Sequence, residues 1–523
     1  MAREYSETVA LLTSGVEDVG RAKTLLTAIM QAAPQIEIPK LIENLGQTAD
    51  PDQVLLSLDR IFSEDARHPS GITATLSARQ IGNRTLRLLG ASEFFASYLV
   101  NHPAALEPLE QQPEPESYLT RLLNAVGAKN LGSDENPCWV AGPKARDLEL
   151  RRVYYALLAQ LAAEDLAHAG MAATKGEFQA TSRRISDLVD AALEAGLALA
   201  RRDHDPEGQI AFSVVAMGKT GARELNYISD VDVIYVGQAR DGADLDSAEA
   251  NRRATAIAQA LGSYCSATGP EPALWVLDAA LRPEGKDGAL VRTLESHLDY
   301  YQRWAKTWEF QALLKARPAA GDRELGARYL STIRPFVWSA VEREGFVEDT
   351  RAMRRRVEKL LDPKKAGREI KLGAGGLRDV EFTVQLLQLV HGRVDESLRV
   401  RATLDALQAL IAGGYIGREQ GEEMADYYRF LRVIEHRTQL DRMRRTHLFP
   451  QDAQLRRVAR SIDVTRFSEG EKLTQAWQEV RQKVRGLHEE IYYRPLLPAV
   501  AKLSAGVAAL DSAAAQSRLQ AIG

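Results

Sequence analysis

The strongest constraint on the fold is that strand-like segments are concentrated in one short region of an otherwise helical sequence. Residues 210–217 (IAFSVVAM) and 231–236 (VDVIYV) are rich in β-branched residues, and 273–281 (ALWVLDAAL) is a third candidate strand. A helical pattern at 248–264 separates the second candidate from the third. Elsewhere, segments such as 150–166 repeat apolar residues at helical spacing. We therefore expect a mostly α protein with an α/β island embedded between helical domains.

The length of the chain predicts several domains. A chain of 523 residues exceeds what a single hydrophobic core usually holds. Loop-like compositions at 111–117 and 132–137 suggest that a first helical domain ends near there. The predicted division is an N-terminal helical domain at 1–135, an α/β domain at 136–295, a C-terminal helical bundle at 296–503 and an Ala- and Ser-rich linker at 504–523.

Charge and composition exclude some classes of protein. The formal net charge of -4 and the pI near 6.2 are less basic than expected of a general nucleic-acid binder. Cys138 and Cys265 lie far apart and lack metal or redox spacing, which fits a reducing compartment. The first residues show no signal-peptide pattern, and no apolar stretch is long enough to span a bilayer. We expect a cytoplasmic protein that binds neither nucleic acid nor membrane.

Two aspartates at the start of the second candidate strand carry the clearest chemical signal. Asp230 and Asp232 alternate along a strand, so their side chains project to the same face. Neighbouring carboxylates repel each other unless a cation lies between them, and Mg²⁺ prefers such oxygen ligands. Val231 and Val233 point to the opposite face and would anchor the strand in a core. The pattern predicts a magnesium site.

Further residues extend this predicted site. Asp278 on the third candidate strand could lie beside the D-x-D strand and provide a carboxylate for a two-metal centre. Gly218 and Gly221 would let the backbone approach a phosphate, while Lys219 and Arg282 add positive charge at the strand ends. Each motif alone is common by chance. Together, in this order, they favour nucleotidyl or phosphoryl transfer.

The same stretch resembles the family of bifunctional glutamine synthetase adenylyltransferase/adenylyl-removing enzymes. That family carries two DNA polymerase β-type nucleotidyltransferase domains, each followed by a helical bundle. Its motif G-K-x-G-x-x-E-L-x-x-x-S-D-x-D matches residues 218–232, and its D-x-x-L-R-P strand matches 278–283. The segments 300–322, expected as a helix, and 371–389 (KLGAGGLRDVEFTVQLLQL) also match. Thr220-Gly221-Ala222 departs from the common Leu-Gly-Gly.

The resemblance also suggests which half of the family's enzyme this chain represents. The adenylyl-removing half typically reads Glu-Leu-Asn before the Ser-Asp pair, as Glu224-Leu225-Asn226 does here, whereas the adenylylating half reads Glu-Leu-Gly. We expect the N-terminal, adenylyl-removing half, with residues 504–523 leading toward an absent second catalytic half.

The resemblance implies a specific reaction. Inorganic phosphate would attack AMP-tyrosine on adenylylated glutamine synthetase, giving ADP and the unmodified enzyme and so regulating nitrogen assimilation. Mg²⁺ would be held by Asp230, Asp232 and Asp278. A PII-type signal protein is an implied partner. Alternatives are adenylylation from ATP and a regulatory module that binds the PII-type protein. The predicted nucleotide and phosphate contacts are Gly218, Lys219, Gly221, Ser229, Arg282 and Arg378, the last following the glycine loop 373–376.

Other positions on the expected helices are assigned from the same patterns. On a helix at 303–317, Trp304, Trp308 and Leu314 are expected in the core. Lys315 and Arg317 are open between a solvated face and nucleotide contact. The segment 428–450 resembles a mixed-charge helix whose histidines are not expected to bind metal.

Overall fold

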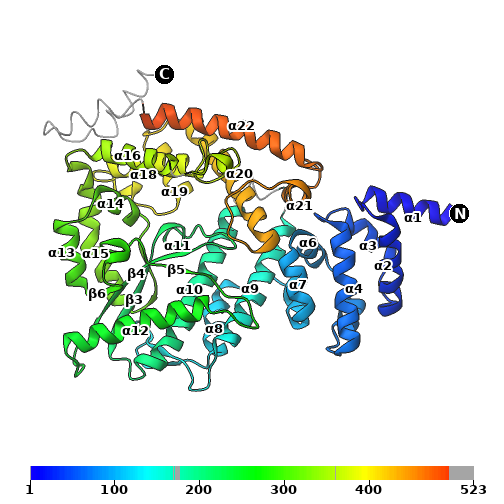
Figure 1. Ribbon diagram of the computed structural model, residues 1–523, viewed down its shortest axis with the longest axis horizontal. Coiled ribbons are helices and arrows are strands. Elements are labelled where there is room, and N and C mark those ends of the chain that lie inside the picture. Colours follow the sequence, from blue (N-terminus) through cyan, green and yellow to red (C-terminus); the bar gives the residue numbers. More distant parts are fainter. Residues whose placement is uncertain (1, 113, 169, 171–176, 360, 494–523) are drawn as a thin grey trace.

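The computed structural model describes residues 2–112, 114–168, 170, 177–359 and 361–493, so the expected linker at 504–523 lies outside the described residues. A small sheet lies among helices, with the N-terminal helices at one end of the molecule (Figure 1). These helices are α1 (Ala2–Thr13), α2 (Val19–Ala32), α3 (Ile38–Leu45), α4 (Pro51–Arg67), α5 (Ile72–Arg79), α6 (Asn83–Ala91), α7 (Glu93–Asn101) and α8 (Tyr118–Ala125).

The central region contains the long helices that support the sheet. The helices expected at 150–166 and 248–264 are confirmed as α9 and α12. The central helices are α9 (Asp147–Ala167), α10 (Glu177–His204), the short α11 (Gly218–Gly221) and α12 (Ser247–Ser266).

The C-terminal region is a bundle in which α22 runs along the outside (Figure 1). Its helices are α13 (Leu294–Arg303), α14 (Thr307–Leu313), α15 (Arg323–Ser339), α16 (Phe346–Lys359), α17 (Pro363–Ala366), α18 (Leu377–His391), α19 (Thr403–Ala412), α20 (Arg418–Arg442), α21 (Asp452–Ile462) and α22 (Gly470–His488). No helix in the described ranges has the length and apolar composition needed to cross a membrane.

The sheet is mixed and follows the order β5-β4-β3-β7, with β6 also paired to β4. β3 is antiparallel to both β4 and β7, whereas β4 is parallel to β5 and β6. The two long strands are therefore confirmed, and the third candidate at 273–281 shrinks to two paired residues. The strands are β3 (Ile210–Ala216), β4 (Val231–Ala239), β5 (Leu277–Asp278), β6 (Val291–Arg292) and β7 (Arg317–Gly321), with β1 (Lys129–Asn130) and β2 (Trp139–Val140) forming a separate pair.

The prediction of a single helix at 300–322 is wrong. The chain breaks between α13 and α14 and then enters the edge strand β7. Pro318 fits the edge strand, because proline has no N–H for a helix or a central strand but is tolerated on an edge. Trp304, expected in the core, falls at the break and is 73% exposed. Leu314 is buried as expected, and Trp308 is half-buried.

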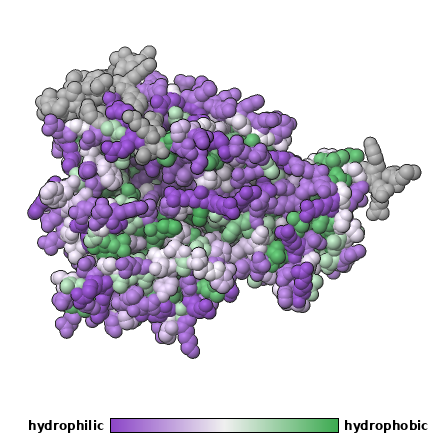
Figure 2. Space-filling model, viewed as in Figure 1, coloured by the Kyte–Doolittle hydropathy of each residue, from purple (hydrophilic) through white to green (hydrophobic). Residues whose placement is uncertain are grey.

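Side chains alternate along β4, so the two faces of the sheet pack against two different hydrophobic cores. Val231 and Val233 pack into the core that contains the N-terminal helices, α9, α10 and α12. Ile234 and Val236 pack into the core of the C-terminal bundle. Asp232 has the same parity as Ile234, so its carboxylate faces the bundle. Hydrophilic side chains cover most of the face shown in Figure 2, with smaller hydrophobic patches between them.

Two glycines offer a test of the packing around the sheet. A Cβ added to Gly221 would lie 2.0 Å from the carbonyl oxygen of Lys315 and 2.6 Å from that of Ala216. Gly262, inside α12, has nothing within 4 Å of its added Cβ. We expect Gly221→Ala to destabilise by about 1–3 kcal/mol or more, because backbone cannot move aside cheaply. Gly262→Ala should stabilise by about 0.5–1 kcal/mol. Thermal unfolding measures both, and equal effects would contradict this packing.

Candidate active site

The sheet brings the three predicted aspartates together. Asp232 on β4 lies directly beside Asp278 on β5 in the parallel register, and Asp230 precedes β4 on the same face. Burial raises the pKa of Asp232, and the charges of Asp278 and Asp230 raise it further, against the opposing charges of Lys371 and Arg378. The three carboxylates are thus close enough to repel one another.

The oxygen ligands of this cluster fit a divalent cation, although Asp230 and Asp278 already have contacts with other groups of the protein. Asp230 Oδ2 lies 2.5 Å from Arg445 Nη1, and Asp278 Oδ1 accepts from the Ala280 N–H at 2.8 Å. Within the described ranges, no three His, Cys, Asp or Glu side chains are already gathered as a metal site. A cation would relieve the repulsion on Asp232, and the oxygens are the ligands that Mg²⁺ prefers. The role of these aspartates stays a prediction.

The glycine turn after β3 is shaped by close approach to Asp232. Gly218 has a φ of +53°, and a Cβ added there would lie 2.1 Å from Asp232 Oδ2. The Met217 N–H donates to the Asp232 carbonyl at 2.8 Å, which fixes the turn against β4. Gly221 instead packs against the Lys315 carbonyl. Ser229 is partly buried in the loop that leads into Asp230.

Lys219 joins this turn to helix α20. Its ammonium is buried and lies 3.0 and 2.8 Å from the two oxygens of Glu435. Burial lowers the pKa of Lys219 to about 7, and the charge of Glu435 opposes that shift. Glu435 also meets Arg432 Nε and His447 Nδ1, each at 3.2 Å. Lys219 therefore couples the predicted phosphate turn to the C-terminal bundle.

The two predicted arginines have different surroundings. The guanidinium of Arg282 donates to the carbonyls of Ala279, Lys286 and Gly288 at 2.9–3.1 Å, so it shapes the loop after β5. Arg378 lies 3.0 Å from Glu381 at the start of α18, and its charge acts on Asp232. Of the two, Arg378 is the one whose charge reaches the carboxylates.

The glycine loop 373–376 is a tight turn that uses its own N–H groups. The Gly375 N–H donates to Asp379 Oδ2 at 2.7 Å, and Gly375 has a φ of +72°. A Cβ added to Gly375 would lie 2.0 Å from the carbonyl oxygen of Arg481 on α22. Gly375 is thus required for packing, and its N–H is already bonded within the loop.

The Glu224-Leu225-Asn226 signature closes the sheet against the bundle. Glu224 accepts from Lys315 Nζ at 3.0 Å and from the Thr403 N–H at the start of α19 at 2.7 Å. Asn226 Oδ1 accepts from Arg432 Nη2 at 2.6 Å. Lys315, open in the sequence between a solvated face and nucleotide contact, is a buried ion-pair partner. Glu224 and Asn226 therefore hold α19 and α20 in position against the sheet that carries the carboxylates.

Sequence reasoning missed the contribution of α20 and the segment after it. The mixed-charge helix expected at 428–450 is confirmed only as far as Arg442, where α20 ends. Its residues 431–441 are buried on all sides, and they include Arg432 and Glu435. The signal that could have indicated burial is that apolar residues occur on every side of this helix, although it also carries charges at every turn. Lys371 and Arg445 were also missed as site residues, because each sits in a run of basic residues that reads as a solvated surface.

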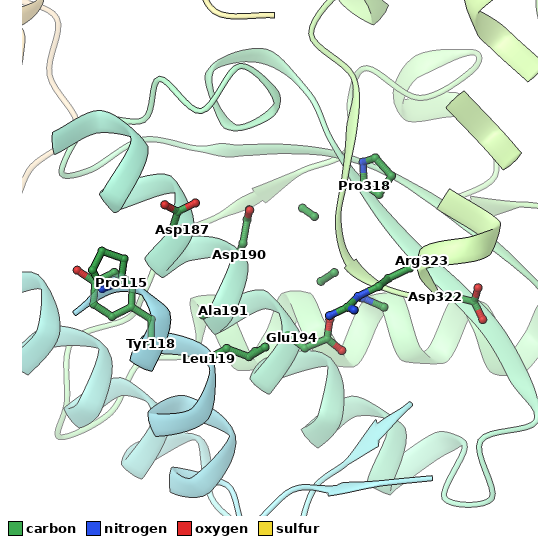
Figure 3. A pocket seen from close by; sticks show the side chains of 13 residues that line it. Pro115, Tyr118, Leu119, Asp187, Asp190, Ala191, Glu194, Pro318, Asp322 and Arg323 are labelled. Atoms are coloured by element: carbon green, nitrogen blue, oxygen red, sulfur yellow. The ribbon is translucent and has the colours of Figure 1, made fainter. Parts of the chain in front are cut away.

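A separate cavity of about 390 Å³ lies beside the edge strand β7 (Figure 3). Its acidic lining comes from Asp187, Asp190 and Glu194 on α10 and from Asp322 directly after β7, and none of the three predicted catalytic aspartates contributes to it. Burial raises the pKa of Asp190 to about 6 against the charge of Arg317, whose nitrogens lie 2.6 and 2.9 Å from its oxygens. Arg317 also donates to the Thr220 carbonyl at 3.0 Å, so it joins the sheet edge to the glycine turn after β3.

Comparisons with known proteins agree with this geometry. Residues 82–332 match the family model described as glutamate-ammonia ligase adenylyltransferase, and residues 348–492 match that described as GlnD PII-uridylyltransferase. The mixed sheet within a mostly helical chain is thus a polymerase β-type nucleotidyltransferase domain.

Individual relatives match over the full length of this chain. It is 44% identical to the bifunctional glutamine synthetase adenylyltransferase/adenylyl-removing enzyme of Streptomyces avermitilis, with 100% of this chain and 50% of the relative aligned. Identity to the same-named enzyme of Streptomyces coelicolor is 46%, covering 51% of it, and to that of Cutibacterium acnes 42%, covering 53%. Each alignment covers all of this chain. The chain spans about half the length of these curated relatives and is similar to one half of such bifunctional enzymes.

The buried carboxylate on α20 gives a stability prediction. Glu435→Gln would leave Lys219 and Arg432 buried without their counter-charge. We expect a loss of about 3–5 kcal/mol in the free energy of unfolding, as when one partner of a buried pair is removed. Glu422→Gln, an exposed position on the same helix, is the matched control and should change stability by less than about 0.5 kcal/mol. Similar denaturation curves for the two variants would contradict the network.

Asp232 gives a prediction with a pH dependence. Its pKa in the folded state is raised above that of the unfolded chain, so the charged carboxylate costs stability at neutral pH. In chelator, Asp232→Asn should raise the unfolding temperature at pH 7 by up to about 3 °C. That gain should shrink as the pH falls and vanish below about 4, where the unfolded-state carboxyl is also protonated.

Asp241→Asn in the exposed loop after β4 is the control for this experiment and should show no such trend. A lower unfolding temperature for Asp232→Asn at pH 7 would mean that Asp232 is a structural residue.

Proposed function

We propose that this chain removes AMP from adenylylated glutamine synthetase by phosphorolysis, giving ADP and the unmodified enzyme. The observation that carries the proposal is the pairing of Asp232 with Asp278 inside a nucleotidyltransferase domain, in a chain similar throughout to half of the bifunctional enzymes. The direction of the reaction is supported by the Glu224-Leu225-Asn226 signature. The reaction is placed in the cytoplasm, which suits two free, buried cysteines.

The residues divide the chemical work. Asp230, Asp232 and Asp278 would hold Mg²⁺, which supplies neutralisation of the phosphate charge in nucleotidyl transfer. An oxygen of inorganic phosphate attacks the phosphorus of AMP, the bond from phosphorus to the tyrosine oxygen breaks, and that oxygen takes up a proton. Phosphate is already an anion, so the chain needs no strong general base. The charge of Arg378 acts on Asp232, and this residue would orient a phosphate group.

The proposed site residues fall into two groups. Gly218 holds the backbone close to Asp232, and Lys219 fixes the turn to α20. Gly221, Ser229 and Arg282 shape the same rim through packing, loop position and carbonyl contacts.

Adenylylation of glutamine synthetase from ATP is the alternative reaction, because the relatives' names carry both activities and the carboxylates would serve either. The match of residues 348–492 to a PII-uridylyltransferase description supports a PII-type signal protein as a partner, and a regulatory role alongside catalysis.

The assay that separates these functions supplies adenylylated glutamine synthetase, Mg²⁺ and phosphate. We expect ADP to form at a rate that rises with phosphate and saturates, and AMP incorporation from ATP into the unmodified enzyme to be slow. Asp230→Asn/Asp232→Asn should lower ADP formation by about 10³-fold or more while retaining the fold. Rapid incorporation without phosphate-dependent release would overturn the assigned direction.

A further inference from the structure

Two cations beside the carboxylates, Lys371 and Arg445, have no role in the reaction proposed above. Lys371 is partly buried just before the glycine loop, and among the cations it acts most strongly on Asp232. Arg445 lies in the segment after α20, is 57% exposed at its side chain and contacts Asp230 at 2.5 Å. Both therefore reach the face of β4 that carries the catalytic aspartates.

The backbone holds these cations on adjoining segments. The Ile370 N–H donates to the His447 carbonyl at 2.8 Å, and an antiparallel bridge joins Glu369 to Leu448. Residues 368–370 therefore run alongside 447–449 in the opposite direction, with Lys371 and Arg445 just beyond this pairing. The Arg378 N–H donates to the Lys371 carbonyl at 2.9 Å, which brings a third cation to the same place.

Lys371 differs from its neighbours in having no direct partner. Arg378 pairs with Glu381, and Arg445 pairs with Asp230. The ammonium of Lys371 feels the charges of Glu435, Glu381 and Asp232, yet it forms no hydrogen bond or ion pair with any residue that the structure describes. Partly buried charges are normally paired, so this ammonium is poised for an anionic ligand.

We propose that Lys371 and Arg445, together with Arg378, form the binding site for the attacking inorganic phosphate. This inference rests on the proposed function and names the residues that take its second substrate. A lysine supplies a point charge, while an arginine can bind two phosphate oxygens at once. The site lies beside Asp230 and Asp232, where a bound phosphate would face the phosphorus of AMP.

The ion pair between Arg445 and Asp230 adds a consequence. Phosphate that draws Arg445 toward itself releases Asp230 to act as a cation ligand. Binding of phosphate and binding of a divalent cation should therefore strengthen each other, because both relieve the same contact.

The first test replaces the ammonium and keeps the length of the side chain. Lys371→Met should raise the KM for phosphate in ADP formation by about tenfold or more, with the KM for adenylylated glutamine synthetase unchanged. Lys364→Met, an exposed lysine in the same segment, is the matched control and should behave as wild type. An unchanged KM for phosphate in Lys371→Met overturns the proposal.

The second test uses Arg445→Gln, whose exposed position protects the fold. This variant should also weaken phosphate binding, yet it should bind Mn²⁺ more tightly by paramagnetic resonance, because Asp230 loses its competitor. Phosphate should tighten Mn²⁺ binding in wild type and do so much less in Arg445→Gln. Arg444→Gln, its exposed neighbour, is the control. Equal loss of phosphate and Mn²⁺ binding would indicate a structural role and overturn the proposal.

Direct binding separates this inference from the proposed function. Inorganic phosphate, ADP and ATP are each titrated against wild type and Lys371→Met by calorimetry. If phosphate binds in a way that depends on Lys371 but the protein shows no phosphorolysis, the phosphate site is supported and the proposed function is rejected. Phosphorolysis with unaltered phosphate binding in the variant would preserve the function and reject the site. A variant defect confined to ADP and ATP would assign these cations to the nucleotide, against the proposal.

Discussion

The buried charges of helix α20 are the interaction on which the rest of the structure depends. Between residues 431 and 441 the helix is buried on all sides, although it carries Arg432, Glu435, Arg437 and Asp441. Buried charges are tolerated only when paired, so each one dictates a partner on another element. Glu435 meets Lys219 of the catalytic turn, Arg432 binds Asn226 before β4, and Arg437 pairs with Asp165 on α9. One helix thereby sets the position of the sheet, the turn and the central helices together.

This arrangement explains why the carboxylates lie at a seam. Strand alternation sends Val231 and Val233 into one core and Ile234 into the other, which leaves Asp232 facing the C-terminal bundle. The cations that act on Asp232 consequently come from the bundle and not from the sheet. The sheet supplies the aspartates of this site, and the C-terminal bundle supplies the cations Lys371 and Arg378 that act on them.

The sequence predicted the elements whose signal is local. β3, β4 and α12 follow from residue type and periodicity, and Asp278 follows from a short motif that pairs in register with Asp232. What failed depends on contacts between distant segments. Pro318 forms an edge strand only because β3 lies beside it, and Trp304 is exposed because the expected helix breaks there. Likewise, no local pattern shows that Lys371 and Arg445 lie on adjoining segments, since those segments are joined by a bridge between the distant residues 369 and 448.

The position of Arg445 links the site to the N-terminal helices. Its segment begins where α20 ends, and there the Ser92 hydroxyl donates to the Leu440 carbonyl at 2.6 Å. Arg457 on α21 contacts both Asp441 and Glu93, at 2.7 and 2.6 Å. Movement of the N-terminal helices against α20 would therefore displace the segment that carries Arg445, and with it the contact to Asp230. Leu440 also belongs to the hydrophobic core of the N-terminal helices, so apolar packing, hydrogen bonds and ion pairs together couple those helices to this end of α20. A partner bound to the N-terminal helices could therefore alter the catalytic carboxylates without unfolding either core.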